Sequence, residues 1–339
     1  MIKFGIQLPH EPLELIIRAA AFADQSNIDS VFTPDHIVGI GIRNFSCYEA
    51  FTLLGKLASI TRRVQLGTCV SDVLRRHPAT LLQSAVTLHE ISNDRAVLGV
   101  GAGEGMNTLP YGIEMKQAVS KLEEALRLMR LLMESERVTF SGKYFRAENA
   151  FISPRKIVPL WIAGNSPRTI RLAAQYGDGW IPTATIGVAG YRENLREIKR
   201  IAGKNIIPAL FAYAVIAEKS EDAEKRIELP GKFIALLSPR RDEFLRDIGL
   251  EVDFPDILGF EFNEMNVRKV LSAAEKVPFE AVQDRYIYGS PDDVIERLEK
   301  FISAGVRHFV IAPLVQERYY MENIRLLSER VIPFLKERE

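Results

Sequence analysis

Apolar positions along the chain follow two alternating patterns, one typical of buried strands and one typical of amphipathic helices. Short apolar runs predict strands at Lys3–Leu8, Ile28–Thr33, Val64–Val70, Ala96–Gly101, Ile157–Ala163, Asp178–Pro182, Ile206–Ala217 and His308–Ala312. Apolar residues at helical spacing predict helices at Glu11–Gln25, Tyr48–Ser59, Pro78–Ile91, Lys116–Glu134, Thr169–Tyr176, Tyr191–Ile201, Pro291–Ser303 and Glu317–Leu335. Strands and helices therefore alternate along the whole chain.

Eight strands with as many helices favour an α/β fold of the (β/α)8 TIM-barrel type over a doubly wound sheet. Such a barrel takes about 250 residues, and the chain has 339. We expect the remainder in two insertions, a small hairpin at Val138–Pro154 and a partly helical segment at Pro230–Phe279. No stretch has the composition of a linker, so residues 1–339 are expected to form a single domain.

Composition limits the possible partners. Basic and acidic side chains number 44 each, which removes the electrostatic argument for nucleic acid or an anionic membrane as a partner. No apolar run approaches the ~20 residues of a bilayer span, and the amino terminus lacks the pattern of a signal peptide. Cys47 and Cys69 are the two cysteines, and no Cys/His spacing indicates a metal site. We expect a cytoplasmic protein.

The segment with the strongest indication of a ligand site follows the predicted strand Ala96–Gly101. Alternating glycines lead to one carboxylate, Glu104, at the carboxyl end of the strand, where α/β proteins bind ligands. The glycines do not complete the G-x-G-x-x-G fingerprint of a dinucleotide site, and a loop follows in place of its helix. Glu104 is therefore a candidate for proton transfer or charge stabilisation on a bound cofactor, and the alternative is a residue that caps a turn.

Polar residues follow other strands as well. Gln7 follows the first strand, Asp35 and His36 follow the second, and Cys69 and Val70 end the third. In a barrel these positions converge on one end. The alternative for Asp35 and His36 is a turn with a helix cap.

The segment Gly164–Arg168 follows the fifth strand. Glycine and serine before a helix, with Pro167 in its first turn, offer free N–H groups and the positive end of the helix dipole to an anion. The segment predicts a phosphate site that includes Arg168, with an ordinary capped helix as the alternative.

Taken in order, these motifs resemble a known family. They are Asp35-His36, Leu66–Val70, His77-Pro78, Leu98–Asn107, Ile162–Pro167 and Gly177–Gly179. The set is similar to the luciferase-like superfamily of flavin and deazaflavin oxidoreductases. Within it, the chain most resembles the branch that uses coenzyme F420, which includes methylenetetrahydromethanopterin reductases, alcohol dehydrogenases and glucose-6-phosphate dehydrogenases.

The resemblance implies an enzyme that transfers hydride between F420 and a small carbonyl, alcohol or pterin-like substrate and that forms a homodimer. For a pterin-like substrate it implies a place in one-carbon metabolism. An FMN-dependent monooxygenase of the same superfamily is the alternative, and a relative that has lost the site is a third possibility. By the same resemblance, His36 handles the substrate proton and Glu104 lies near the pyrimidine part of the deazaflavin.

The resemblance also implies the cofactor contacts. The ring system and ribityl chain would be held by Asp35, Cys69, Val70, Ala102, Gly103 and Asn107. The phosphate end would be held by Gly164, Asn165, Ser166, Arg168 and Thr169. A cis peptide is expected between Cys69 and Val70, behind the ring.

Three departures bear on the substrate. Gln7 replaces the glutamate of methylenetetrahydromethanopterin reductases, and Ile40 replaces the tryptophan of alcohol and sugar-phosphate members. Thr183–Gly187 lacks the lysine of the sugar-phosphate members. A phosphorylated sugar is therefore not expected, and the substrate stays open.

Overall fold

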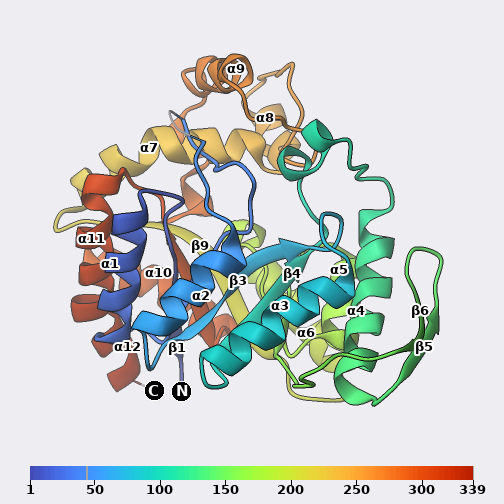
Figure 1. Cartoon of the computed structure of the whole chain (residues 1–339). Coiled ribbons are helices and arrows are strands. Elements are labelled where there is room, and N and C mark those ends of the chain that lie inside the picture. The colour runs from blue at the N-terminus through green and yellow to red at the C-terminus, as the bar shows by residue number, and fades with distance from the viewer. Residues whose placement is uncertain (43–44, 339) are drawn as a thin grey trace.

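The computed structural model describes residues 1–42 and 45–338 and contains a closed barrel of parallel strands (Figure 1). Around the barrel the strands are β1 (Lys3–Gln7), β2 (Ser30–Thr33), β3 (Gln65–Asp72), β4 (Ala96–Gly101), β7 (Leu160–Ile162), β8 (Gly179–Trp180), β9 (Ile207–Ile216) and β11 (His308–Pro313). Each pairs with the next, and β11 closes the ring on β1. The predicted TIM barrel is confirmed.

A ninth strand, β10 (Ile287–Gly289), was not predicted. It pairs with the last three residues of β9, of which the first, Ala214, also pairs with Pro313 of β11. Its three residues are too few to show a period in the sequence, so no local pattern distinguishes it from a loop.

Helices cover the outside of the barrel (Figure 1). They are α1 (Leu13–Asp24), α2 (Ala50–Ile60), α3 (Pro78–Ile91), α4 (Ala118–Glu134), α5 (Pro167–Tyr176), α6 (Gly187–Ile201), α10 (Pro291–Ala304), α11 (Glu317–Leu326) and α12 (Ile332–Glu337). One π-helical turn, Leu327–Val331, joins α11 to α12. No helix in the described ranges is long and apolar enough to cross a bilayer.

Successive strand residues face opposite sides of the barrel wall. Phe32, Val97, Trp161 and Val310 belong to a small cluster that fills the interior, whereas Leu98 belongs to the larger cluster between strands and helices. This packing makes the barrel a solid core and leaves its two ends for function.

The two insertions lie close to the predicted positions. The first is a hairpin of β5 (Val138–Ser141) and β6 (Arg146–Ala150), which pair antiparallel. The second carries α7 (Ser220–Leu237), α8 (Arg241–Asp247) and α9 (Glu264–Ala274) around an apolar cluster of its own. Pro230, where the sequence places the start of this insertion, lies inside α7, which begins ten residues earlier.

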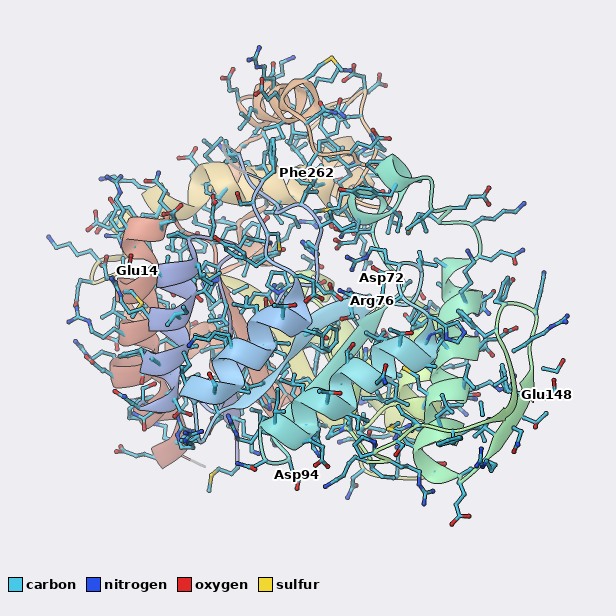
Figure 2. The ribbon with its side chains drawn as sticks, in the orientation of Figure 1. Glu14, Asp72, Arg76, Asp94, Glu148 and Phe262 are labelled. Atoms are coloured by element: carbon cyan, nitrogen blue, oxygen red, sulfur yellow. The ribbon has the colours of Figure 1, made fainter. Side chains whose placement is uncertain are left out.

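The second insertion lies at the end of the barrel opposite to both termini (Figure 1). In Figure 2, Glu14, Asp94 and Glu148 point outward to solvent, whereas Asp72 and Arg76 lie below the insertion that carries Phe262. The backbone N–H of Gly105 donates to the carbonyl of Ile257 at 3.2 Å. The insertion therefore packs on the loop after β4, at the carboxyl ends of the strands, which we call the barrel mouth.

Candidate active site

His36 and Glu104 meet at the barrel mouth. The loop after β2 carries His36 and the loop after β4 carries Glu104, and His36 Nε2 lies 3.3 Å from Glu104 Oε2. Glu104 precedes a short 3₁₀ turn, Gly105–Asn107, but its side chain does not cap that turn. The interpretation of Glu104 as a turn cap is therefore wrong. No pattern in the sequence indicated that the two side chains touch.

Burial shifts the two groups in opposite directions, since it disfavours whichever form is charged. Burial raises the pKa of Glu104 to about 7, with repulsion from Asp72 adding to it and Arg75 opposing it. Burial lowers the pKa of His36 well below its usual value, with His10 and Arg75 lowering it further. Near neutral pH the pair is therefore a carboxyl that can still carry its proton beside an uncharged imidazole, and not a fixed ion pair.

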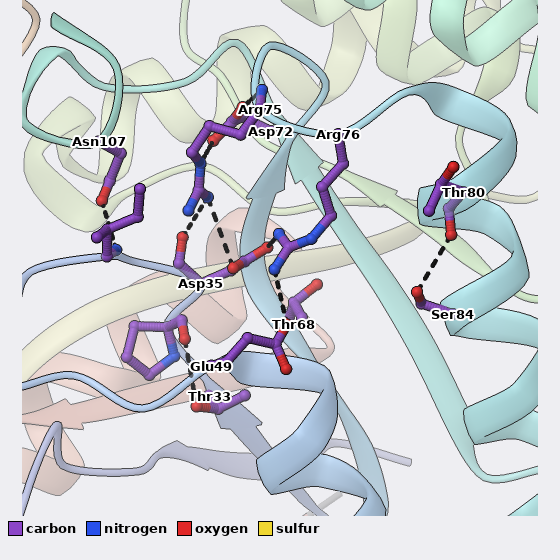
Figure 3. Close-up of polar contacts among 12 residues, drawn as sticks. Thr33, Asp35, Glu49, Thr68, Asp72, Arg75, Arg76, Thr80, Ser84 and Asn107 are labelled. Atoms are coloured by element: carbon purple, nitrogen blue, oxygen red, sulfur yellow. Dashed lines mark hydrogen bonds and ion pairs between the residues drawn. The ribbon is translucent and has the colours of Figure 1, made fainter. Parts of the chain in front are cut away.

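Charged side chains behind this pair join the loops after β2 and β3 (Figure 3). Asp35 is buried and binds the guanidinium of Arg76, which also contacts Glu49 at 2.7 Å. Glu49, and not Asp35, caps α2. The interpretation of Asp35 as a helix cap is therefore wrong, and its carboxylate serves to hold the mouth together.

The expected cis peptide between Cys69 and Val70 is present. The pairing of β3 with β4 shifts register at this point, between Thr68 and Ser71. A Cβ on Gly99 would lie 2.1 Å from the carbonyl oxygen of Thr68, and one on Gly101 would lie 2.8 Å from Val70 Cγ2. These two glycines of β4 therefore serve the close packing of β4 on the irregular part of β3.

The loop that carries Glu104 is fixed to its neighbours. Asn107 is buried, and its Oδ1 accepts a hydrogen bond from the backbone N–H of Ile37 at 2.8 Å. Gly103 has a φ of 94°, a conformation that glycine adopts at little cost. Ala102 lies beside it, partly buried. The loops of His36 and Glu104 are thus joined by this backbone-to-side-chain hydrogen bond as well as by the contact of His36 with Glu104.

The start of α5 is a capped helix. Ser166 and Thr169 form a capping box, and the N–H of Ser166 donates to Thr169 Oγ1. A Cβ on Gly164, whose φ is 140°, would collide with Thr169. The Arg168 guanidinium is 47% exposed and pairs with Glu123 at 2.7 Å. Asn165 Oδ1 is buried without a hydrogen-bond partner, while its amide donates to Thr183 Oγ1.

Two further side chains belong to the site and were missed. The ring of His10, three residues past β1, lies 5.7 Å from that of His36, and burial lowers its pKa to about 4. Burial raises the pKa of Tyr213 in β9, with Glu104 and Cys69 adding to the shift. His10 follows a strand end and could have been found by that rule, but Tyr213 lies within an apolar run and shows no signal.

Among the residues that the structure describes, no three His, Cys, Asp or Glu side chains are placed to hold a metal ion, and both cysteines are free thiols.

The acid–imidazole pair lies at the carboxyl ends of the strands of a closed α/β barrel, which is where enzymes with this fold carry their active sites. The chain matches the luciferase-like monooxygenase family over residues 2–308. It belongs to this family and is an oxidoreductase, which confirms the family resemblance seen in the motifs.

Curated relatives match most of the chain. An F420-dependent glucose-6-phosphate dehydrogenase of Beutenbergia cavernae is 30% identical over 352 residues, which cover 100% of this chain and 99% of the relative. A phthiodiolone/phenolphthiodiolone dimycocerosates ketoreductase of Mycobacterium tuberculosis is 31% identical over 306 residues, which cover 85% of this chain and 79% of the relative.

Solved structures share the fold at lower identity. An F420-dependent secondary alcohol dehydrogenase in complex with an F420–acetone adduct has a TM-score of 0.75 at 23% identity, with 97% of this chain and 99% of that chain covered. The coenzyme F420-dependent tetrahydromethanopterin reductase from Methanopyrus kandleri has a TM-score of 0.77 at 21% identity, with 98% and 99% covered.

Proposed function

We propose that this protein transfers hydride between coenzyme F420 and a small carbonyl, alcohol or pterin-like substrate. The observation that carries the proposal is the contact between a carboxyl with a raised pKa and a neutral imidazole at the barrel mouth. The full-length similarity to an F420-dependent dehydrogenase supports the same cofactor. A homodimer and a cytoplasmic location belong to the proposal, and a place in one-carbon metabolism would follow only from a pterin-like substrate.

The residues present fit such a cofactor. Five buried polar atoms at the carboxyl ends of strands or on the loops that follow them lack a hydrogen-bond partner: Gln7 Oε1, His10 Nε2, His36 Nδ1, Glu104 Oε2 and Asn165 Oδ1. Unpaired buried polar atoms are costly and call for an explanation. They follow four different strands, β1, β2, β4 and β7, and a ligand that spans the mouth would satisfy them.

Within this proposal the ring and ribityl chain are held by Asp35, Cys69, Val70, Ala102, Gly103 and Asn107. The phosphate end is held by Gly164, Asn165, Ser166, Arg168 and Thr169. When bound, F420 supplies a carbon that accepts or gives up hydride, whereas the protein supplies orientation and control of charge.

Glu104 and His36 have separate roles in proton transfer. Protonated Glu104 would donate a hydrogen bond to the pyrimidine edge of the bound cofactor, where negative charge would be stabilised. His36 is kept neutral by its surroundings and can therefore accept the hydroxyl proton of an alcohol as hydride leaves. In the opposite direction the same imidazole must first gain a proton, and Glu104 is the acid in contact with it.

Titration of the purified protein with F420 and with FMN, followed by absorbance, tests the cofactor. We expect micromolar or tighter binding of F420 and much weaker binding of FMN. Single-turnover hydride transfer should fall about 10²–10⁴-fold in Glu104→Gln and in His36→Asn, with His36→Asn affecting an alcohol more than a substrate without a proton to lose. Equal affinity for both cofactors, or oxygen-dependent turnover with reduced FMN, would favour the monooxygenase.

A further inference from the structure

Arg75 places a buried positive charge between the loops after β2 and β3. Its side chain is only 8% exposed, and its Nε contacts Asp72 Oδ2 at 2.5 Å. Its Nη2 donates to the backbone carbonyl of Asp35 and lies 3.6 Å from Asp35 Oδ1. Figure 3 shows the guanidinium between the two aspartates. One fork thus binds a backbone carbonyl on the residue before His36 and a carboxylate on the neighbouring strand end.

The loop of Arg75 is itself fixed by Asp72. Asp72 Oδ1 accepts the backbone N–H groups of Leu74 and Arg75, each at 2.9 Å, and the Asp72 side chain is almost fully buried. The guanidinium therefore has little freedom to move, and its contact with the Asp35 carbonyl fixes the chain at the point where His36 begins.

The charged and titratable groups around Arg75 come from every element at this side of the mouth. They are Asp72 and Arg76 from the loop after β3, Asp35, His36 and Cys47 from the segment after β2, Glu49 at the start of α2, Glu104 after β4 and His10 after β1. Arg75 acts on both members of the acid–imidazole pair, whereas Arg76 is held by Asp35 and Glu49.

We propose that Arg75 is a positioning residue for hydride transfer, which holds the backbone of the His36 loop and places a fixed positive charge beside the acid–imidazole pair. The proposal rests on the function proposed above for His36 and Glu104. Arg75 touches neither of them by hydrogen bond in this structure and is assigned no proton transfer of its own. Its effect comes from a position and a charge that the fork geometry of arginine fixes together.

The direction of the charge effect follows from electrostatics. A nearby cation disfavours protonated imidazole and favours ionised carboxyl, so it lowers the pKa of both groups. The charge of Arg75 has this effect on both groups, since it lowers the pKa of His36 and that of Glu104. Removal of the guanidinium should raise both pKa values, and His36 should then hold a proton at a pH where the wild-type imidazole is free to accept one.

Ring-labelled histidine NMR on the cofactor-free protein tests the proposal without reference to any reaction. The chain has five histidines, and His36→Asn assigns the signal of His36. In Arg75→Gln the titration midpoint of His36 should rise by about one pH unit or more. In Arg75→Lys, which keeps the charge but not the fork, the midpoint should stay close to that of the wild type.

Arg76→Gln is the matched control, since it removes the neighbouring cation and should leave the His36 midpoint in place. The double variant Asp72→Asn/Arg75→Gln removes the guanidinium together with the carboxylate it binds, and it serves where the single variant does not fold. An unchanged midpoint in the folded Arg75→Gln or double variant, or an equal shift in Arg76→Gln, would overturn the charge role.

The pH profile of single-turnover hydride transfer is the second measurement. It should move to higher pH in Arg75→Gln and return in Arg75→Lys. A purely structural role would lower the rate at every pH and leave the profile in place. If F420 supports no hydride transfer at all, the proposed function fails, whereas the NMR midpoint still decides the role of Arg75.

Discussion

At the scale of single residues, the site depends on which groups are kept uncharged. Glu104 is 35% exposed overall, but its Oε2 atom is buried against His36. Burial pushes a carboxyl toward its protonated form and an imidazole toward its neutral form. Near neutral pH the Glu104 carboxyl can therefore still carry a proton, while the His36 imidazole is free to accept one.

Glu104 should make the stability of the protein depend on pH. Its pKa is about 7 in the folded chain and near its ordinary value when unfolded. The folded state therefore binds more protons between about pH 4.5 and 7, and its stability falls as pH rises through that window. Glu104→Gln removes this loss, so its melting temperature relative to wild type should be higher at pH 8 than at pH 5.

Thermal unfolding at the two pH values measures this difference. Glu148→Gln removes an equal charge from the exposed hairpin and is the matched control (Figure 2). A melting-temperature difference for Glu104→Gln that is the same at pH 5 and pH 8 would mean that the carboxyl is ionised throughout.

At the scale of elements, the start of α5 combines a capped helix with the proposed phosphate end. The capping box takes up the N–H groups of Ser166 and Thr169, and Glu123 from α4 pairs with Arg168. A phosphate that binds Arg168 must therefore compete with Glu123. The two side chains are exposed, so the competition takes place in water, where such a pair contributes little to stability.

Two variants with opposite expected effects test this arrangement. Arg168→Ala should weaken F420 binding about ten- to a hundredfold, since a charge-assisted hydrogen bond is worth roughly 1.5–3 kcal/mol. Glu123→Gln should not weaken it and is expected to strengthen it, because the guanidinium becomes free. Fluorescence titration with F420 measures both. Unchanged affinity in Arg168→Ala would remove Arg168 from the phosphate site.

At the scale of the whole molecule, the second insertion packs against the mouth of the barrel. Its apolar cluster packs with Ile40, Ile42 and Phe45 of the segment after β2 and with Tyr213 of β9. Its backbone also meets the loop of Glu104 at Gly105. The insertion therefore contacts three of the elements that form the site, and a change at this contact should affect ligand binding more than the barrel.

Gly105→Ala tests this contact. A Cβ on Gly105 would lie 2.3 Å from the carbonyl oxygen of Leu258, a backbone atom that cannot rotate away. The insertion must then shift, and overpacking of this kind costs about 1–3 kcal/mol. We expect weaker F420 binding and faster hydrogen exchange around Ile257. A Cβ on Gly203 meets nothing within 4 Å, so Gly203→Ala is the control, and equal behaviour of the two variants would contradict the proposed contact.

Much of the fold could be predicted because its signals are local. The eight barrel strands lie where apolar runs occur, and the run Ala96–Gly101 matches β4 at both ends. The start of α7 was missed, because no helix was predicted between Ala217 and Pro230, whereas α7 begins at Ser220 and runs through Pro230. The three residues of β10 are recognisable only by their pairing with β9.

The sequence by itself determined the barrel, the family and the side chains that follow each strand, since these depend on period and on order along the chain. Only the tertiary structure decided that His36 touches Glu104, that His10 and Tyr213 join them, and that Arg75 stands behind the pair. The physical reason is that residues on or after β1, β2, β3, β4 and β9 jointly determine the charge states and contacts at the mouth. These residues lie up to about 200 positions apart in the chain, so no local pattern in the sequence reveals their combined effect.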